Sequence, residues 1–204
     1  MEFWINLAEE EIRRQKKNQP IKHYIKNSHN DLIQLMIANV IKVDIDDEDE
    51  TELTGVSQSA SAALYKFAYL LGSIFIQPVV SFVSGNITSQ DPRMRYASVI
   101  SLGTCTECQD KQAFAGILIP SIPNLLQMYN DTSVRVRQAI SWFFYKIAEN
   151  YADIMTQSEE STQTFVQVVL KALKDNPNVS AQACQTLEQL AIFLRPNDPQ
   201  QMTN

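Results

Sequence analysis

The sequence predicts an all-α protein in which helix pairs stack into an α-solenoid. Apolar residues recur with the period of a helix along most of the 204 residues, and almost no segment shows the alternation of a strand. Short joints with helix-capping residues and prolines separate the apolar stretches, and three of these joints share a residue pattern. We therefore expect residues 1–204 to form a single array of about four helix pairs behind a leading helix.

The helices follow in chain order from this periodicity. A leading helix and four pairs are expected at residues 3–18, 21–42, 54–71, 74–88, 92–109, 111–129, 133–150, 160–174 and 178–194. A strongly acidic run separates the two helices of the first pair. The joints inside the other pairs carry N-capping residues, with proline at the first helical position in two of them: Asp91-Pro92, Asn130-Asp131-Thr132-Ser133 and Asp175-Asn176-Pro177.

The helices after these three joints begin alike. Ala97, Ala139 and Ala183 occupy matching places, and they are 42 and 44 residues apart. Helix pairs with this period are typical of HEAT and armadillo arrays. Asp131 and Arg137 have an Asp-x5-Arg spacing that fits a HEAT repeat, in which such residues hydrogen-bond between neighbours. The predicted fold is therefore an α-solenoid of HEAT repeats.

The two ends of the sequence lack the polar face of a capping repeat. The chain begins with Glu2-Phe3-Trp4, which already has a helical pattern, and its last helix pair is soon followed by Asn197-Asp198-Pro199. Terminal repeats of a solenoid need a polar outer face for solubility. We therefore expect this chain to be a piece of a longer array.

An acidic run lies inside the first helix pair, in a predicted loop at residues 43–53. Seven of the nine residues from position 44 to 52 are carboxylates: Asp44, Asp46, Asp47, Glu48, Asp49, Glu50 and Glu52. Like charges at this density repel one another and bury nothing, which is typical of a solvated interaction segment. Because the loop is tethered to a folded array, it is expected to attract a basic protein and raise its rate of encounter.

Composition narrows the classes of partner. The net charge is −6 and the isoelectric point is about 4.9, which argues against nucleic acid, since phosphates require patches of Lys and Arg. No apolar stretch approaches the roughly 20 residues that cross a bilayer, and the first residues do not resemble a secretory signal. Basic protein segments are the partners that remain, and we expect no contact with nucleic acid or membrane.

Nothing in the sequence indicates catalysis, a cofactor or a metal. The five glycines form no phosphate-binding loop, and both histidines precede residue 30. The acidic run is no EF-hand, because Asp49 stands where that loop needs glycine. Cys105 and Cys108 form a C-x-x-C without a second half-site, so we expect two packing cysteines, and the odd count of three indicates a reducing compartment.

The helix 133–150 is expected to carry a binding stripe. Val136, Ile140, Phe143 and Ile147 fall on one narrow face, which must be the core, and the opposite face carries Gln138, Trp142, Tyr145 and Glu149. Aromatic rings beside a carboxylate can hold the stem and the cation of Lys or Arg. The alternative is that neighbouring repeats cover the ring of Trp142, and the wheel leaves both open. Glu107 takes the place of Glu149 on the preceding repeat, on the same ridge as Tyr96 and Ile100. Two successive exposed ridges are therefore expected each to offer a carboxylate and an aromatic ring.

These residues resemble the central HEAT repeats of importin beta, the karyopherin nuclear import receptor, over roughly residues 2–194. The acidic loop has the family's place and character, and residues 95–103 resemble its R-D-A-A-V-x-A-F-G. Residues 131–137 resemble its D-P-S-V-x-V-R, and Trp142 follows at the position of a family tryptophan. Glu107 and Glu149 fall on family glutamates, and Phe3-Trp4 resembles a family F-W. Thr54 and Gln185 depart from the family, because each replaces a tryptophan.

The resemblance implies a transport function in the cytoplasm, the nucleus and the nuclear pore. In the family, the acidic loop and the concave tryptophans bind the arginine-rich helix of the adaptor importin alpha. The same loop meets the Ran GTPase, and outer helices near it meet Phe-Gly repeats of nucleoporins. By this resemblance, the partners of the present chain would be an importin-alpha-type adaptor or basic cargo carrying nuclear localisation signals, Ran, and Phe-Gly nucleoporins.

Two other classes of protein remain as alternatives. One is another HEAT scaffold, such as a phosphatase-regulatory or condensin-like subunit, which has no evident need for an acidic loop inside a repeat. The other is a helical enzyme that uses paired carboxylates. Such an enzyme needs its carboxylates held on several rigid elements, and here they are concentrated in one loop.

Overall fold

The computed structural model describes residues 1–45, 55–156 and 158–195, and every regular element within them is a helix. A leading helix, α1 (Glu2–Lys16), precedes four pairs, as predicted. The pairs are α3 (His29–Val40) with α4 (Val56–Leu71), α5 (Ser73–Asn86) with α6 (Pro92–Thr104), α7 (Lys111–Gln127) with α8 (Val134–Asn150), and α10 (Glu159–Ala172) with α11 (Pro177–Leu194).

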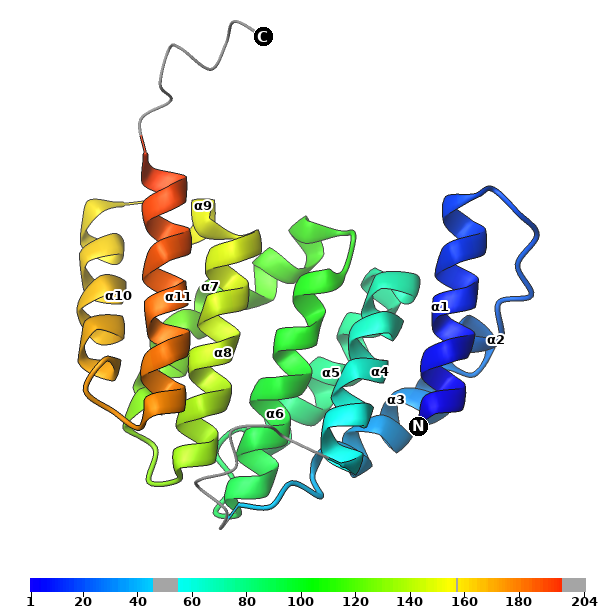
Figure 1. Ribbon diagram of the computed structural model, residues 1–204, viewed down its shortest axis with the longest axis horizontal. Helices are drawn as coiled ribbons and strands as arrows, with labels where there is room; N and C mark the ends of the chain where they lie inside the picture. The colour runs from blue at the N-terminus through cyan, green and yellow to red at the C-terminus, as the bar shows by residue number, and fades with distance from the viewer. Residues whose placement is uncertain (46–54, 157, 196–204) are drawn as a thin grey trace, which may run out of the picture.

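The helices form two rows (Figure 1). The second-helix row consists of α1, α4, α6, α8 and α11, and each of these helices contacts the next. Behind it lies the first-helix row of α3, α5, α7 and α10. The arrangement confirms the predicted α-solenoid, in which each repeat packs mainly on its neighbours.

The core lies between the two rows. The predicted core face of α8 is confirmed, because Val136, Ile140, Phe143 and Ile147 are all fully buried. Phe143 packs edge to face on Phe144, which in turn contacts Phe165 of α10 at a centroid distance of 5.2 Å. Burying a side chain of this size stabilises the fold by about 1.5–3 kcal/mol.

The predicted helix 21–42 is wrong in its first half. The backbone takes left-handed conformations at Asn18 (φ 51°) and His23 (φ 56°), so regular structure begins only with the short helix α2 (Tyr24–Asn27). Ser28 then separates α2 from α3. The buried carboxylate of Glu11, on α1, accepts the Tyr24 N–H at 2.7 Å and fixes this start. A side chain 13 residues away therefore decides where the helix begins.

The ends of two further helices differ from the sequence prediction, and one short helix is additional to it. The helix 92–109 ends at Thr104 and continues as a 3₁₀ turn, η1 (Cys105–Glu107), and α7 likewise passes into η2 (Met128–Asn130). A short helix, α9 (Ala152–Met155), was not anticipated. Cys105 begins η1 and Cys108 follows its last residue. Both are buried free thiols, so they pack as predicted, and burial raises the pKa of the Cys105 thiol.

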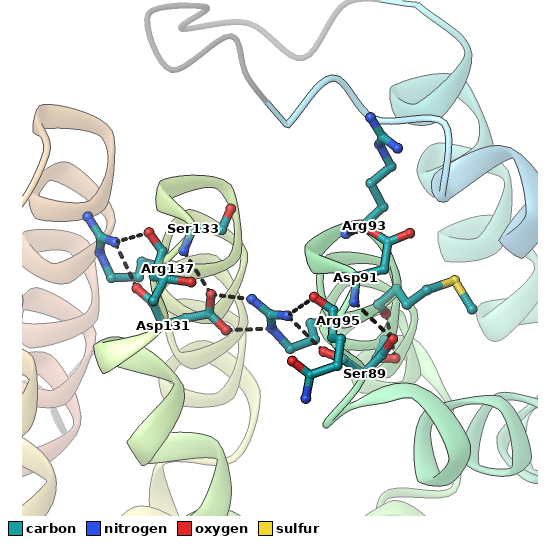
Figure 2. A network of polar contacts seen from close by, with 11 residues as sticks. Ser89, Asp91, Arg93, Arg95, Asp131, Ser133 and Arg137 are labelled. Atoms are coloured by element: carbon teal, nitrogen blue, oxygen red, sulfur yellow. Dashed lines mark hydrogen bonds and ion pairs between the residues drawn. The ribbon is translucent and has the colours of Figure 1, made fainter.

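Neighbouring repeats are joined by paired arginines and aspartates, and Figure 2 shows the pair of Arg95 and Asp131. Arg95 donates to both carboxylate oxygens of Asp131, at 2.7 and 2.8 Å, and Arg137 does the same to Asp175, at 2.6 and 2.9 Å. Each guanidinium also donates from Nη1 to a carbonyl of its own joint, that of Ser89 or Asp131. We call these contacts the arginine ladder, and they confirm the predicted hydrogen bonding between neighbours.

Candidate protein-binding surface

A groove of about 750 Å³ crosses the exposed side of the second-helix row. Four helices that follow one another in the second-helix row supply its lining. Small residues and longer polar or aromatic ones both contribute. The lining comes from α4 (Gln58, Ser61, Ala62, Tyr65 and Lys66), α6 (Tyr96, Ile100 and Thr104), α8 (Arg135, Gln138, Ala139 and Trp142) and α11 (Asn178, Ala181 and Gln182). We call it the main groove.

The floor of the main groove is built by residues that the helical wheel placed on an exposed ridge. Tyr96 and Ile100 are only 2% and 6% exposed, because α4 and α8 cover them on either side. Burial raises the pKa of Tyr96 to about 12, so its hydroxyl stays neutral. The prediction of an exposed aromatic on α6 is therefore wrong, and these two residues support the groove from below.

Trp142 lies in the wall of the main groove and is half-buried. One edge of its ring rests on Gly103 of α6, where the missing side chain leaves room for it. The rest of the ring lines the groove together with Gln138, one helical turn away. Each of the two expectations for Trp142 thus describes one part of the ring, since the neighbouring repeat covers an edge and the groove receives the remainder.

The other residues of the predicted stripe meet at the end of the groove, around a lysine. Tyr145 is half-buried and Glu149 is exposed, both on α8. Lys146 Nζ lies 2.7 Å from Glu149 Oε2, and it lies 5.3 Å and 5.6 Å from the ring centroids of Tyr145 and Tyr65. We call Tyr65, Tyr145 and Glu149 the cation cage.

Glu107 is joined to this cage from the preceding repeat. Its carboxylate accepts a hydrogen bond from the Tyr65 hydroxyl, which connects η1 with α4. Burial and this hydrogen bond raise the pKa of Tyr65 to about 12. The hydroxyl therefore remains a donor, and the Glu107 carboxylate lies beside the cage.

Of the carboxylates in the acidic run, the structure describes only the first. Asp44 is exposed just after α3, while Asp46, Asp47, Glu48, Asp49, Glu50 and Glu52 lie outside the described residues, as does Thr54. The base of the run is anchored, because Val43 is buried and the Ser57 hydroxyl of α4 donates to the Val40 carbonyl at 2.9 Å. The carboxylates are thus tethered where α3 and α4 meet.

Sequence reasoning missed three residues of this surface, namely Tyr65, Lys146 and Arg135. Lys146 follows Trp142 by four residues, so the wheel that grouped Trp142 with Tyr145 and Glu149 already contained it. Tyr65 comes from a helix two places along the row, and no local pattern indicates that it reaches α8. Arg135 is 1% exposed and donates to Gln138 at 3.2 Å.

A second groove lies on the other side of the molecule, between α5 and α7 of the first-helix row. Its volume is about 550 Å³, and half-buried apolar side chains supply much of its wall, including Val80, Val83, Ile87 and Ile117. Leu102 of α6 closes its base. We call it the outer groove.

Across residues 1–45, 55–156 and 158–195, no cluster of three His, Cys, Asp or Glu side chains is placed to hold a metal ion. None of the helices in this part of the chain is long and apolar enough to cross a bilayer.

Comparison with known proteins agrees with the repeat architecture. Residues 122–151, which cover the joint between α7 and α8, match the HEAT repeat family. The whole chain is 28% identical to the importin subunit beta-1 of Saccharomyces cerevisiae over 211 residues, and 98% of it is 25% identical to that of Schizosaccharomyces pombe. The chain spans 24% of the length of each of these relatives.

Solved structures of yeast importin beta have the same fold. The structure of Kap95p superposes with a TM-score of 0.86 at 28% identity, over 97% of this chain and 24% of that one. Kap95p solved in a study of how it induces the switch loops of RanGDP also gives 0.86, and the Kap95:Nup1 complex gives 0.85, each over 94% of this chain and 23% of Kap95. By sequence and by fold, the chain is therefore an importin-beta-like array of HEAT repeats.

Proposed function

We propose that the chain is part of a nuclear import receptor that binds arginine-rich segments, without catalysis. The observation that carries this proposal is that one end of the main groove is already built to hold a cation. Tyr65, Tyr145 and Glu149 surround an ammonium group there, with Glu107 beside them. The importin beta-1 relatives support the same reading, and the place of action would be the cytoplasm, the nucleus and the nuclear pore.

The partner that fits the main groove is an amphipathic basic helix. Its aliphatic and aromatic side chains would lie on the apolar parts of the groove beside Trp142, and its arginines would reach Glu107 and Glu149. The acidic run would act earlier, because a dense group of carboxylates attracts a basic segment over about 10 Å at 0.1 M salt. An importin-alpha-type adaptor or a basic cargo supplies such a helix.

Two further partners are proposed on separate grounds. Kap95p acts on the switch loops of RanGDP, and this relative supports Ran as a partner of the acidic run. Kap95 also forms a complex with Nup1, which supports a Phe-Gly nucleoporin as the occupant of the outer groove. A phenylalanine ring would replace water on the apolar wall formed by Val83 and Ile117.

The test is a binding measurement with three immobilised ligands: an arginine-rich adaptor helix, GTP-loaded Ran and a Phe-Gly peptide. We expect the adaptor helix to bind the 204-residue chain at low salt and to be released as salt increases. An Ile117→Asp variant should lose the Phe-Gly peptide and keep the adaptor helix, because Ile117 lines only the outer groove. A phosphatase-regulatory or condensin-like scaffold would bind none of the three.

A further inference from the structure

The cation cage is occupied by a residue of the protein itself. Lys146 has the three contacts that would recognise a basic partner there: an ion pair with Glu149 at 2.7 Å and the faces of two tyrosine rings at 5.3 and 5.6 Å. Its side chain is only 17% exposed. An exposed lysine has many rotamers, and most of them leave the ammonium in water. The folded protein therefore favours the Lys146 rotamer that places the ammonium group in the cation cage.

The cage joins two repeats that are not adjacent in the second-helix row. Tyr65 comes from α4, whereas Lys146, Tyr145 and Glu149 come from α8. The helix between them, α6, ends at Thr104, and its turn η1 brings Glu107 to the Tyr65 hydroxyl. Side chains of α4 and α8 thus meet directly, with Lys146 over the ring of Tyr65.

The cage continues the main groove. Lys146 is four residues from Trp142, so the two side chains lie one above the other on the same face of α8. A helix lying on Trp142 would present its own i and i+4 side chains with the same spacing. One basic residue of that helix would therefore arrive where the Lys146 ammonium is.

We propose that Lys146 is an internal competitor, which fills the cation cage in the free protein and is displaced by an arginine of the bound partner. The proposal rests on the proposed function, since it concerns the same basic helix. On binding, the Lys146 ammonium would move into solvent and a guanidinium would take its contacts with Glu149 and the two tyrosines. Lys146 would thereby set which basic partners bind.

The exchange favours arginine over lysine. The ion pair of Lys146 is modest in strength because Glu149 is 38% exposed, so water replaces much of it when the lysine leaves. A guanidinium stacks on aromatic faces and binds a carboxylate with two hydrogen bonds, whereas an incoming lysine would only reproduce the contacts that it displaces. We therefore expect a lysine-rich helix to be excluded more strongly than an arginine-rich one.

The experiment removes the competitor and keeps the stem. Lys146→Met in the 204-residue chain is compared with the wild type and with Lys174→Met, which removes the same charge from an exposed position after α10. Affinity is measured by fluorescence anisotropy for an arginine-rich helix and for its lysine-substituted copy. We expect Lys146→Met to bind the lysine copy about fivefold more tightly than the wild type does, and to show a smaller gain for the arginine helix. Lys174→Met should gain less than twofold with either peptide because its charge is distant and screened.

A second measurement does not depend on a variant. Amine acylation of the wild-type chain, read by mass spectrometry, should become faster at Lys146 when the arginine helix is bound, because the displaced ammonium enters solvent. Lys66, which lines the groove, should become slower.

The outcomes are separable. If the wild type binds the helix and Lys146→Met matches Lys174→Met or binds more weakly, or if Lys146 becomes protected, Lys146 is a structural strut and the inference is wrong while the proposed function stands. If the wild type binds no basic helix at any salt concentration, the proposed function fails and the inference fails with it.

Discussion

The ring of Trp142 lies directly on the backbone of Gly103, across the boundary between two repeats. A methyl group at Gly103 would be 2.3 Å from Cζ3 of the ring and 2.9 Å from Cη2, which is far inside van der Waals contact. Glycine within a helix costs about 1 kcal/mol relative to alanine, so α6 gives up helix stability at this position. In return, the missing side chain at Gly103 leaves room for the ring of Trp142 at the wall of the main groove.

Gly103→Ala should therefore be destabilising although it improves helix propensity. The clash with a packed ring costs about 1–3 kcal/mol, against a gain of at most about 1 kcal/mol in the helix. Urea denaturation measures the balance, and binding of the basic helix should weaken in parallel because the ring is displaced. Gly116→Ala on α7 is the matched control, since nothing lies within 4 Å of its added methyl, and it should be neutral or stabilising. A stabilised Gly103→Ala variant with normal binding would contradict the conclusion that Trp142 requires glycine at this position.

Trp142→Ala should affect binding more than folding. If Trp142 is a binding hot spot, the loss in partner affinity should be about 2 kcal/mol or more, measured by isothermal titration with the arginine-rich helix. Its half-buried ring contacts Gly103, so some free energy of unfolding should also be lost, but less than the roughly 3–5 kcal/mol of a fully buried aromatic. Phe143→Ala, one residue away and fully buried, should show the reverse order of effects. Equal losses of stability in both variants, with unchanged affinity for Trp142→Ala, would assign the tryptophan to the core.

Neutralising the acidic run should reduce both the affinity for the basic helix and its dependence on salt. The variant replaces Asp46, Asp47, Glu48, Asp49 and Glu50 with Asn or Gln, and anisotropy is measured from 50 to 300 mM salt, concentrations over which the screening length falls to roughly half. The control carries the same charge change at exposed positions outside the run: Glu2, Asp31, Asp153, Glu160 and Glu188. Identical salt slopes for the two variants would mean that net charge alone acts, and that the run has no special role.

The arginine ladder should make the stability of the fold depend on pH in the acidic range. The hydrogen bond from Arg137 holds the pKa of Asp175 below its usual value in the folded protein. A carboxylate whose pKa is depressed by folding contributes stability above its unfolded pKa of about 3.9, and this contribution disappears as the pH falls through the folded pKa. The melting temperature of Asp175→Asn should thus lie below that of the wild type at pH 6, and the difference should shrink on acidification below about pH 4. A gap that stays constant with pH would show that the charge of Asp175 does not matter.

The repeats could be predicted from the sequence because the residues that define each helix face and each joint lie close together in the chain. The core face of α8 follows from four residues on one helix, and the hydrogen bonding between neighbouring repeats follows from the Asp-x5-Arg spacing of Asp131 and Arg137. The start of α2 could not be predicted, because it depends on the carboxylate of Glu11 in another helix. The burial of Tyr96 was missed for the same reason, since a helical wheel does not include the neighbouring helices that cover it.

The binding surface was predictable only as far as single helices define it. Trp142, Tyr145 and Glu149 were grouped correctly on one face of α8, but the wheel gave no reason to single out Lys146 among them. Tyr65 approaches across two repeats, at a sequence separation of 81 positions from Lys146, so only the fold reveals that it completes the cage.

The arginine ladder runs in one direction, with each arginine bonded to the aspartate of the repeat that follows it. Every repeat joined in this way therefore presents an arginine to the repeat that follows it and an aspartate to the repeat that precedes it. Deleting residues 98–139 would place Arg95 opposite Asp175, where the same set of bonds is available. A gene could lengthen or shorten such a protein by whole units without inventing a new interface, so the ladder is a connector that makes the repeats interchangeable.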